Sequence, residues 1–465
     1  MAQRFVACDR EQSFLMPPDV REWLPENHLA WFVIGAVEEM NLDAFYAAHR
    51  VDGRSRPPYD PAMMVALLLY AYARGIPSSR VIERACAEDV AFRVIAAQRR
   101  PDHATIARFL ERHQDALAGL FAEVLTLCAR SGLAKVGVIA VDGSKVQANA
   151  SRNENLDYEQ LAREIVQEAL ATDAAEDELY GEARGDELPA EFSTEQGRRG
   201  WLREAKQRLE AERATDPQPV PRSRPKRLKD AKRRLEEELW TEVRANDAYE
   251  HYRAHGRMKN GRRFGALPKP YTPPEIPEGR VNVTDPDSKV VKGLRGWIQG
   301  YNAQAVTNEY HIVLAAEVQT VGADFGHLEP MLDAAQRELA AAGVDETPGV
   351  LLADAGYWHG EQMQRIVDRG IPVLIPPDTS RRRTTRRNWD GGHYDFMRRV
   401  LASERGGELY RKRQPMIEPV FAQVKFNRRL DRFRRRGRGA VRTEWRLITA
   451  THNILKLHRY ATAAA

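Results

Sequence analysis

The chain has 465 residues, of which 43% are hydrophobic and 29% are charged, as is typical of a globular protein with two or three domains. The apolar stretch "MMVALLLYAYA" at Met63 is shorter than the ~20 residues of a membrane span, and the N-terminus "MAQRFVACDREQSF" lacks the apolar core of an export signal. Cys8, Cys86 and Cys128 lie far apart without CxxC spacing. We therefore expect a protein of the reducing cytoplasm, without a membrane segment, disulfide framework or zinc site.

The net charge of +5 conceals a local asymmetry. Residues 378–446 contain 21 Lys and Arg against 8 Asp and Glu, whereas the rest of the chain is net acidic. Such a basic segment is either a solvated surface or the electrostatic footprint of a polyanionic partner. The charge pattern alone leaves both interpretations open.

Residues 1–132 are predicted to form a helical domain. The stretch "DPAMMVALLLYAYARG" from Asp60 has an Asp cap, a proline in its first turn and a closing glycine, which are complete helix start and stop signals. Further helical stretches begin near Ser78 and Pro101, each next to a residue that can cap a helix. Short helices with turn-length connections fit either a DNA-reading helix-turn-helix or an ordinary helical bundle.

The apolar periodicity changes at Val136, where "VGVIAVDGSKVQ" predicts a buried strand with Asp142 at its centre. Residues 133–153 thus form the first strand of a core. Residues 154–280 are charged and carry leucines at near-heptad spacing on both sides of a proline-rich break. They predict a helical hairpin with coiled-coil character, inserted into the core and unable to supply a strand.

Strands resume in residues 281–465. The stretches "WIQGYNAQAVTN" and "YHIVLAAEVQT" predict a hairpin, and "PGVLLADAGYW" predicts a strand with Asp354 at its centre. A helix precedes that strand, and a second helix leads to a last strand, "IPVLIPP". This order predicts an α/β sheet with helices on its faces.

Three acids stand out. Asp142 and Asp354 lie in apolar strands, where a carboxylate needs a partner; a shared cation would serve both, although each Asp alone also fits a cap or a turn. Glu418 is the single acid within "YRKRQPMIEPVFAQVK", where a divalent cation would reconcile a carboxylate with phosphate binding. We predict that a helix starts at Glu418, because Pro419 fits a first turn, and that Lys425, seven residues on, shares its face.

These residues resemble the bacterial insertion-sequence transposases of the DDE type. In that family a Tyr, Arg, Glu and Lys signature surrounds the third acid, and Tyr410, Arg413, Glu418 and Lys425 match it. One departure is that four residues separate Arg413 from Glu418, where the signature has three. The N-terminal helical stretches and "GYNAQ" at Gly300 also resemble the family's helical domain and second core strand.

The resemblance implies a fold and an activity. The fold is α/β, an RNase H-like mixed sheet flanked by helices, with an all-helical, DNA-binding N-terminal domain and a helical insertion after the first core strand. The activity is metal-dependent DNA cleavage and strand transfer during transposition. Two alternatives remain open: an RNase H-fold DNA nuclease without strand transfer, and an inactive transposase-derived DNA-binding protein.

The resemblance also implies a site and partners. Two Mg²⁺ ions, with Mn²⁺ as a substitute, would be held by the catalytic acids Asp142, Asp354 and Glu418. The partners are double-stranded DNA, at the element ends and the target, and further copies of the chain in a homodimer or higher assembly, in the cytoplasm at the nucleoid. Asn302, Gln304, Asp324 and His327 are additional candidates for the cleft, and Asp324 or Glu317 is an alternative ligand. Side chains of the basic segment would hold the DNA backbone, namely Tyr410, Arg413, Lys425, Arg428, Arg429, Arg434, Arg435 and Arg436.

Overall fold

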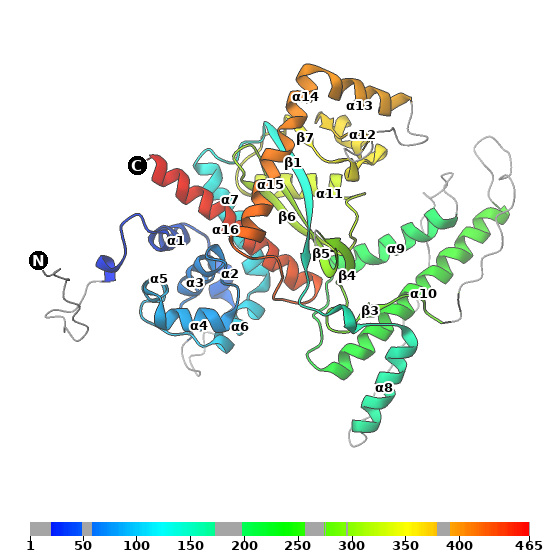
Figure 1. Cartoon of the computed structure of the whole chain (residues 1–465), viewed down its shortest axis with the longest axis horizontal. Coiled ribbons are helices and arrows are strands. Elements are labelled where there is room, and N and C mark those ends of the chain that lie inside the picture. The colour runs from blue at the N-terminus through cyan, green and yellow to red at the C-terminus, as the bar shows by residue number, and fades with distance from the viewer. Residues whose placement is uncertain are drawn as a thin grey trace, which may run out of the picture.

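The computed structural model describes residues 20–48, 58–172, 198–255, 274, 276–293, 296–378 and 391–464. After a short 3₁₀ turn at Val20–Trp23, the N-terminal region, blue to cyan in Figure 1, is helical throughout. Its helices are α1 (Leu29–Glu38), α2 (Asp43–Ala47), α3 (Pro61–Ala73), α4 (Ser79–Glu88), α5 (Val90–Ile95), α6 (His103–Arg112) and α7 (Gln114–Arg130).

Helix α3 forms the centre of this region. Asp60 caps it by accepting a hydrogen bond from the Ala62 amide at 3.1 Å, and Pro61 occupies its first turn, as the sequence predicts. Nearly every residue from Met64 to Ala73 is buried, so α3 is covered on all sides by neighbouring helices.

A mixed sheet follows the helical region. Its strands are β1 (Val138–Gln147), β4 (Lys289–Gly293), β5 (Gly296–Asn308), β6 (Val313–Gln319), β7 (Val350–Leu352) and β8 (Val373–Leu374). The order is β4-β5-β1-β7-β8, with β6 also pairing with β5. β1 runs antiparallel to β5 and parallel to β7. Because β1 occupies one edge of β5, β4 and β6 pair with successive parts of its other edge. This curled mixed sheet with its helices is consistent with the expected RNase H-like core.

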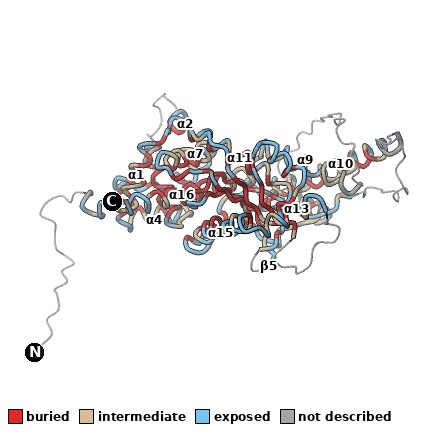
Figure 2. The backbone as a smooth tube through the Cα atoms, turned by 90° about the horizontal axis from the view of Figure 1, so that it is seen from above, coloured by how far each residue is buried: buried red, intermediate tan, exposed pale blue. Residues whose placement is uncertain are grey.

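Helices cover the sheet and connect it to the N-terminal region. They are α11 (Leu328–Ala341), α12 (Gly360–Asp368), α13 (Gly392–Ala402), α14 (Glu404–Arg411), α15 (Arg413–Ala422) and α16 (Arg438–Ala464). α15 packs on β1 and β5, while α16, red in Figure 1, packs against α7, α3 and β6. One hydrophobic core therefore includes side chains from both regions, and Figure 2 shows buried backbone running through both.

The helices of the insertion lie on the side of the sheet away from the N-terminal helices (Figure 1), although Arg222, between two of these helices, pairs with Glu111 of α6 at 2.7 Å. It contains α8 (Tyr158–Thr172), α9 (Arg198–Thr215) and α10 (Arg224–His255), and α10 packs on both of the others. A separate small core includes Leu161, Leu228 and Leu235.

The expectation that the insertion supplies no strand is wrong at one point. The two-residue strand β2 (Asn155–Leu156) pairs with β3 (Val281–Asn282) and closes the neck of the insertion. Propensity reasoning misses a pair this short, because side chains from β3 and the insertion helices bury together around it. Of the helices in the described ranges, none is both long and apolar enough to span a membrane.

Candidate active site

Asp142 lies near the middle of β1, as predicted, opposite Ala305 of β5. Its Oδ1 accepts a hydrogen bond from the Gly143 amide at 2.8 Å, and its Oδ2 accepts one from Nη1 of Arg413 at 3.0 Å. Burial raises the pKa of Asp142 to about 6; Arg413 opposes that shift, whereas the nearby charge of Asp354 adds to it. The carboxylate form of Asp142 is therefore disfavoured by burial, and a neighbouring cation would favour it.

Asp354 lies next to Asp142, but not at the centre of a strand. β7 ends at Leu352, and Asp354 caps the following 3₁₀ turn, Ala355–Tyr357, by accepting a hydrogen bond from the Gly356 amide at 2.8 Å. Strands β1 and β7 are parallel with Ala140 opposite Leu352. Asp142 and Asp354 each come two residues after this pair, so the parallel register places them level with each other.

Glu418 lies on α15, the helix that also places Arg413 on Asp142. The prediction that the helix starts at Glu418 is wrong, because α15 begins at Arg413 and Pro419 lies inside it. A proline here leaves the carbonyl of the residue four positions earlier without its helical donor. That carbonyl, of Pro415, instead contacts Nε2 of His311 at 2.9 Å, which explains how the helix continues.

The side chain of Glu418 is exposed, whereas Met416 and Ile417 beside it are buried against the sheet. Within the described ranges, no three His, Cys, Asp or Glu side chains are already arranged as a metal-binding group. The convergence of Asp142, Asp354 and Glu418 on one metal centre therefore stays a prediction. The structure itself brings together the first two acids and the helix that carries the third.

A polar network supports β1 next to Asp142. Oδ1 of Asp324 accepts hydrogen bonds from Lys145 at 3.2 Å, Asn302 at 2.8 Å and Gln304 at 2.8 Å. Gly143 permits this packing, because a Cβ there would come within 2.4 to 2.6 Å of the Gln304, Asn302 and Asp324 side chains. Glycine is thus required at this position by close approach of side chains.

Several properties of this region fit a hard divalent cation. Asp142 and Asp354 supply carboxylate oxygens, and the charge of Asp354 adds to the burial that raises the pKa of Asp142, a repulsion that a cation would relieve. An all-oxygen set of this kind suits Mg²⁺ or Mn²⁺.

Comparison with known families decides the identity. A family model described as Transposase domain (DUF772) matches residues 18–112, and a second, described as Transposase DDE domain, matches residues 377–458. The two matches support an insertion-sequence transposase of the DDE type. Neither the curated proteins nor the solved structures contain a significant match.

The Tyr410, Arg413 and Lys425 side chains of this transposase all lie near β1. Tyr410 is partly buried at the end of α14, and burial raises its pKa against a smaller lowering effect of the nearby Arg413. Lys425 lies in a π turn, Gln423–Asn427, and its Nζ donates to the Lys145 carbonyl at 2.6 Å. Burial lowers the pKa of Lys425 to about 8, so its charge is poorly solvated and available for an anion.

Arg428 and Arg429 are neighbours with opposite environments. Arg428 is only 6% exposed and donates to Thr451 Oγ1 at 2.7 Å and to the Ile448 carbonyl at 3.1 Å. Burial lowers its pKa to about 9. Arg429 is exposed, with a positive φ of 56°. Because the guanidinium of Arg428 is internal, we leave it out of the DNA contacts proposed below, although the sequence placed it among them.

The three successive arginines Arg434, Arg435 and Arg436 lie in a loop next to the end of β1. Arg436 donates to the Asn149 carbonyl at 3.0 Å, and Arg435 donates to Gln114 at 2.9 Å. The backbone amides of Arg434 and Arg435 donate to the buried carboxylate of Glu444. Arg434 and Arg436 are exposed, whereas Arg435 is partly buried. The loop is therefore fixed from inside while two of its side chains face solvent.

The site contains residues that the sequence did not single out. Lys145, three positions after Asp142, and Tyr357, three after Asp354, both join the polar network, Tyr357 through a hydrogen bond to Gln304. The sequence did contain a signal for Lys145. Side chains alternate along a strand, so in "VDGSK" Gly143 and Lys145 face the side opposite Asp142, and a lysine on that buried side needs an acidic partner. Burial lowers the pKa of His327 to about 4, and Glu317 is held by Arg442 at 2.7 Å.

Proposed function

We propose that this transposase cuts DNA at the ends of its element and joins the freed 3′ ends to target DNA, with metal ions held by Asp142, Asp354 and Glu418. The observation that carries the proposal is that Asp142, in β1, and Asp354, just after β7, lie close together beside the helix that bears Glu418. Mg²⁺ is the expected metal and Mn²⁺ its substitute.

The metal pair supplies Lewis-acid activation of the attacking hydroxyl and stabilisation of the leaving 3′ oxygen in an in-line displacement. Asp142 and Asp354 are oriented for their task by the amides of Gly143 and Gly356. Arg413 neutralises Oδ2 of Asp142 in this structure and exchanges that carboxylate for a DNA phosphate oxygen when substrate binds. Lys425 holds a second phosphate beside β1.

The N-terminal helices and the exposed basic side chains complete the DNA contacts. Arg429, Arg434 and Arg436 are exposed and contact the backbone without reading its sequence. The helical region, matched by the Transposase domain model, reads the element ends. Joining two ends to one target requires two active sites, so the transposase works as a homodimer or higher assembly on DNA at the nucleoid.

The test is a cleavage and joining assay. Wild-type protein, Mg²⁺ and a duplex carrying the terminal repeats that flank the coding region should give a nick or break at the repeat and a joined product. Asp142→Asn and Glu418→Gln should each lower the cleavage rate about 10³-fold or more, while DNA affinity measured in EDTA changes little. The matched control is Glu408→Gln, an exposed acid on α14, which should cleave normally.

Each outcome has a separate meaning. Metal-dependent cleavage by Glu418→Gln at the wild-type rate would remove Glu418 from the site, and the same result for Asp142→Asn would overturn the proposal. Cleaved ends without any joined product would limit the activity to that of a nuclease. Binding without cleavage by the wild type would indicate a DNA-binding protein that has lost its activity.

A further inference from the structure

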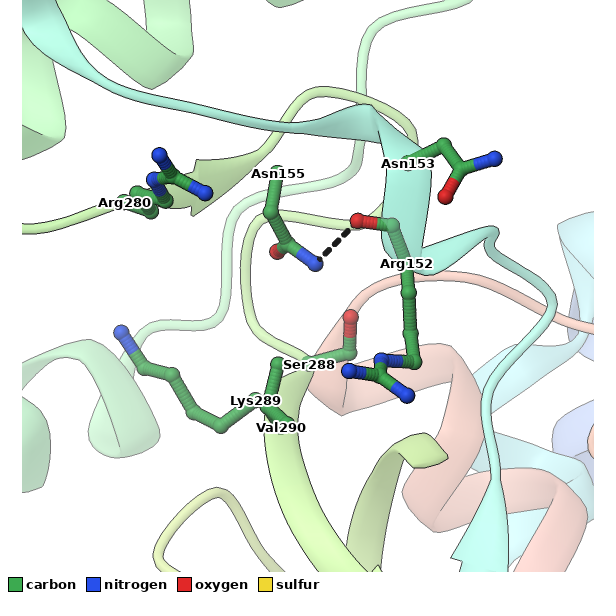
Figure 3. Close-up of a pocket in the computed structure, with 7 residues that line it drawn as sticks. All are labelled: Arg152, Asn153, Asn155, Arg280, Ser288, Lys289 and Val290. Carbon is green, nitrogen blue, oxygen red and sulfur yellow. Dashed lines mark hydrogen bonds between the residues drawn. The ribbon is translucent and has the colours of Figure 1, made fainter. Parts of the chain in front are cut away.

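A polar cavity of about 660 Å³ lies where the insertion leaves the sheet (Figure 3). Three chain segments that are distant in sequence form it: the turn after β1, the residue before β3, and the start of β4. The lining residues are Arg152, Asn153, Asn155, Arg280, Ser288, Lys289 and Val290. None of them belongs to the acid site or to the basic C-terminal segment.

The cavity is positively charged, since three of its lining residues are cations and none of the seven is an acid. Arg152 donates to a backbone carbonyl, of Trp297, at 3.1 Å. Arg280, 64% exposed, lies 3.9 Å from Asp157, and Lys289 lies 3.8 Å from Glu238. The Arg280 pair is exposed and the Lys289 pair is partly exposed, and ion pairs at such distances contribute little, so much of this charge remains available to a ligand.

The neutral part of the lining is held rigidly. Asn155 donates to the Arg152 carbonyl at 2.7 Å, a bond drawn in Figure 3, and to Gln299 at 2.9 Å. The buried Gln299 in turn donates to Oγ of Ser288 at 2.8 Å. These bonds fix the turn that carries Arg152 against the strand that carries Lys289. The cations are thus presented by a preorganised frame, which lowers the entropy cost of binding an anion.

We propose that this cavity binds backbone phosphates of DNA beyond the catalytic cleft. The inference rests on the proposed function, since it takes the same duplex as ligand. Guanidinium, ammonium and amide donors without an acid are the groups that hold phosphate oxygens. From Asp142 to the end of β1 at Gln147 is about 17 Å at 3.3 Å per residue, and the cavity lies past that end. That distance is about five steps of 3.4 Å along a DNA strand.

The first test measures binding alone, in EDTA, so that no cleavage occurs. Full-length Arg152→Ala/Arg280→Ala/Lys289→Ala is compared with Arg130→Ala/Lys206→Ala/Arg337→Ala, which removes the same charge from side chains outside the cavity. Anisotropy of a labelled 30-base-pair duplex is followed from 50 to 200 mM salt. The cavity variant should lower the slope of log affinity against log salt by about two to three units, and the control by less than one. Equal slopes for the two variants, or no change in either, would overturn the proposal.

The second test locates the DNA directly and does not depend on a loss of affinity. Asn153→Cys, made together with Cys8→Ser, provides a thiol at the exposed edge of the cavity, while native Cys86 and Cys128 are buried. DNA carrying a bromoacetamide group on a single backbone phosphorothioate should alkylate this cysteine at positions about five or more nucleotides from the cleavage site, with the Cys8→Ser chain as background. Absence of cross-linking above background at every position would overturn the proposal.

A free anion is the other source of the same chemistry. If 20 mM inorganic phosphate raises the melting temperature of the wild type but not that of the cavity variant, and no cross-link to DNA forms, the cavity belongs to a free phosphate compound and the assignment to DNA is wrong. Because both tests run without metal, they stay informative if the chain proves unable to cleave. Conversely, cleavage with unchanged binding by the cavity variant would overturn this inference alone and leave the proposed function intact.

Discussion

Two basic regions of the transposase differ in how far their cations are used inside the fold. The C-terminal segment is conspicuous in the sequence, with three successive arginines and the pair Arg428 and Arg429, yet several of these groups have partners inside the fold. The cavity at the base of the insertion is inconspicuous in the sequence, because its cations come from three separate segments. Charge that is dense along the chain is partly structural here, whereas the charge that the fold gathers at the cavity is the one proposed above to hold DNA phosphates.

The physical reason is what each guanidinium contacts. Arg428 connects α16 to the π turn after α15, with further contact to the Tyr72 carbonyl at 3.5 Å. In the cavity, by contrast, the nearest acids of Arg280 and Lys289 lie at almost 4 Å. The comparison predicts that substitutions in the first region change stability, and that those in the second change DNA affinity.

The largest expected effect is that of Arg428→Ala. The substitution removes the donors to Ile448 and Thr451 and leaves a void at a junction between α3 and α16, so we expect unfolding free energy to fall by about 2–4 kcal/mol. Urea denaturation followed by fluorescence measures the change. The control is Arg429→Ala, whose side chain is exposed, and it should cost less than about 0.5 kcal/mol. Equal costs for the two variants would remove the distinction between them.

Asp285 connects the two regions and gives a smaller, pH-dependent effect. Its Oδ1 accepts the Tyr301 hydroxyl at 2.7 Å and the Gly437 amide, at the end of the arginine loop, at 3.1 Å. The carbonyl of Asp285 accepts Oγ of Ser288, which lines the cavity, at 2.7 Å. Burial raises the pKa of Asp285 to about 6, against the lowering effect of Tyr301. A raised carboxyl pKa contributes stability that is full below about 4 and is lost as pH rises through about 6.

Tyr301→Phe should therefore destabilise the protein more at pH 8 than at pH 5. At pH 8 the Asp285 carboxylate is ionised and loses its hydroxyl donor, which costs about 2–3 kcal/mol, whereas at pH 5 the acid is mostly protonated and the cost is about 1 kcal/mol. Urea denaturation at both pH values provides the measurement, with Tyr310→Phe on the exposed hairpin turn as the control. A loss independent of pH would mean that Asp285 does not titrate between them.

Much of the fold was predictable from the sequence. Periodicity and caps predict α3, β1, β5 and β6, because these elements are long and one pattern dominates each of them. Asp354 was placed at a strand centre, yet β7 ends two residues earlier, since an apolar run alone does not mark where backbone pairing stops. Short β4 pairs along the first part of β5 and was not anticipated, because its stability comes from its partner.

The acids of the candidate site were predictable from the sequence, but the residues that position the surrounding helix and loop were not. Asp142 and Asp354 were recognised as acids in apolar strands, and their proximity follows from the parallel pairing of β1 and β7. The start of α15 was predicted wrongly, because the sequence does not reveal that His311 would contact the carbonyl that Pro419 leaves free. Likewise, the sequence alone does not reveal that Arg428 would be internal and Arg429 exposed, since both follow from tertiary packing.

The smallest expected effect separates the arginines of the loop from one another. Arg434 is exposed and its backbone amide, not its side chain, is held by Glu444, so Arg434→Ala should leave stability unchanged and lower the salt slope of DNA binding by about one unit. Arg435 is partly buried, donates to Gln114, and has an Nη1 that is buried without a partner. Its replacement by alanine should lower stability by about 1 kcal/mol and leave the salt slope unchanged.

The triple alanine variant at 434, 435 and 436 should then lose about two units of slope and not three. A loss of three units would mean that Arg435 reaches a phosphate when DNA binds, and an unchanged slope would show that the whole loop is structural.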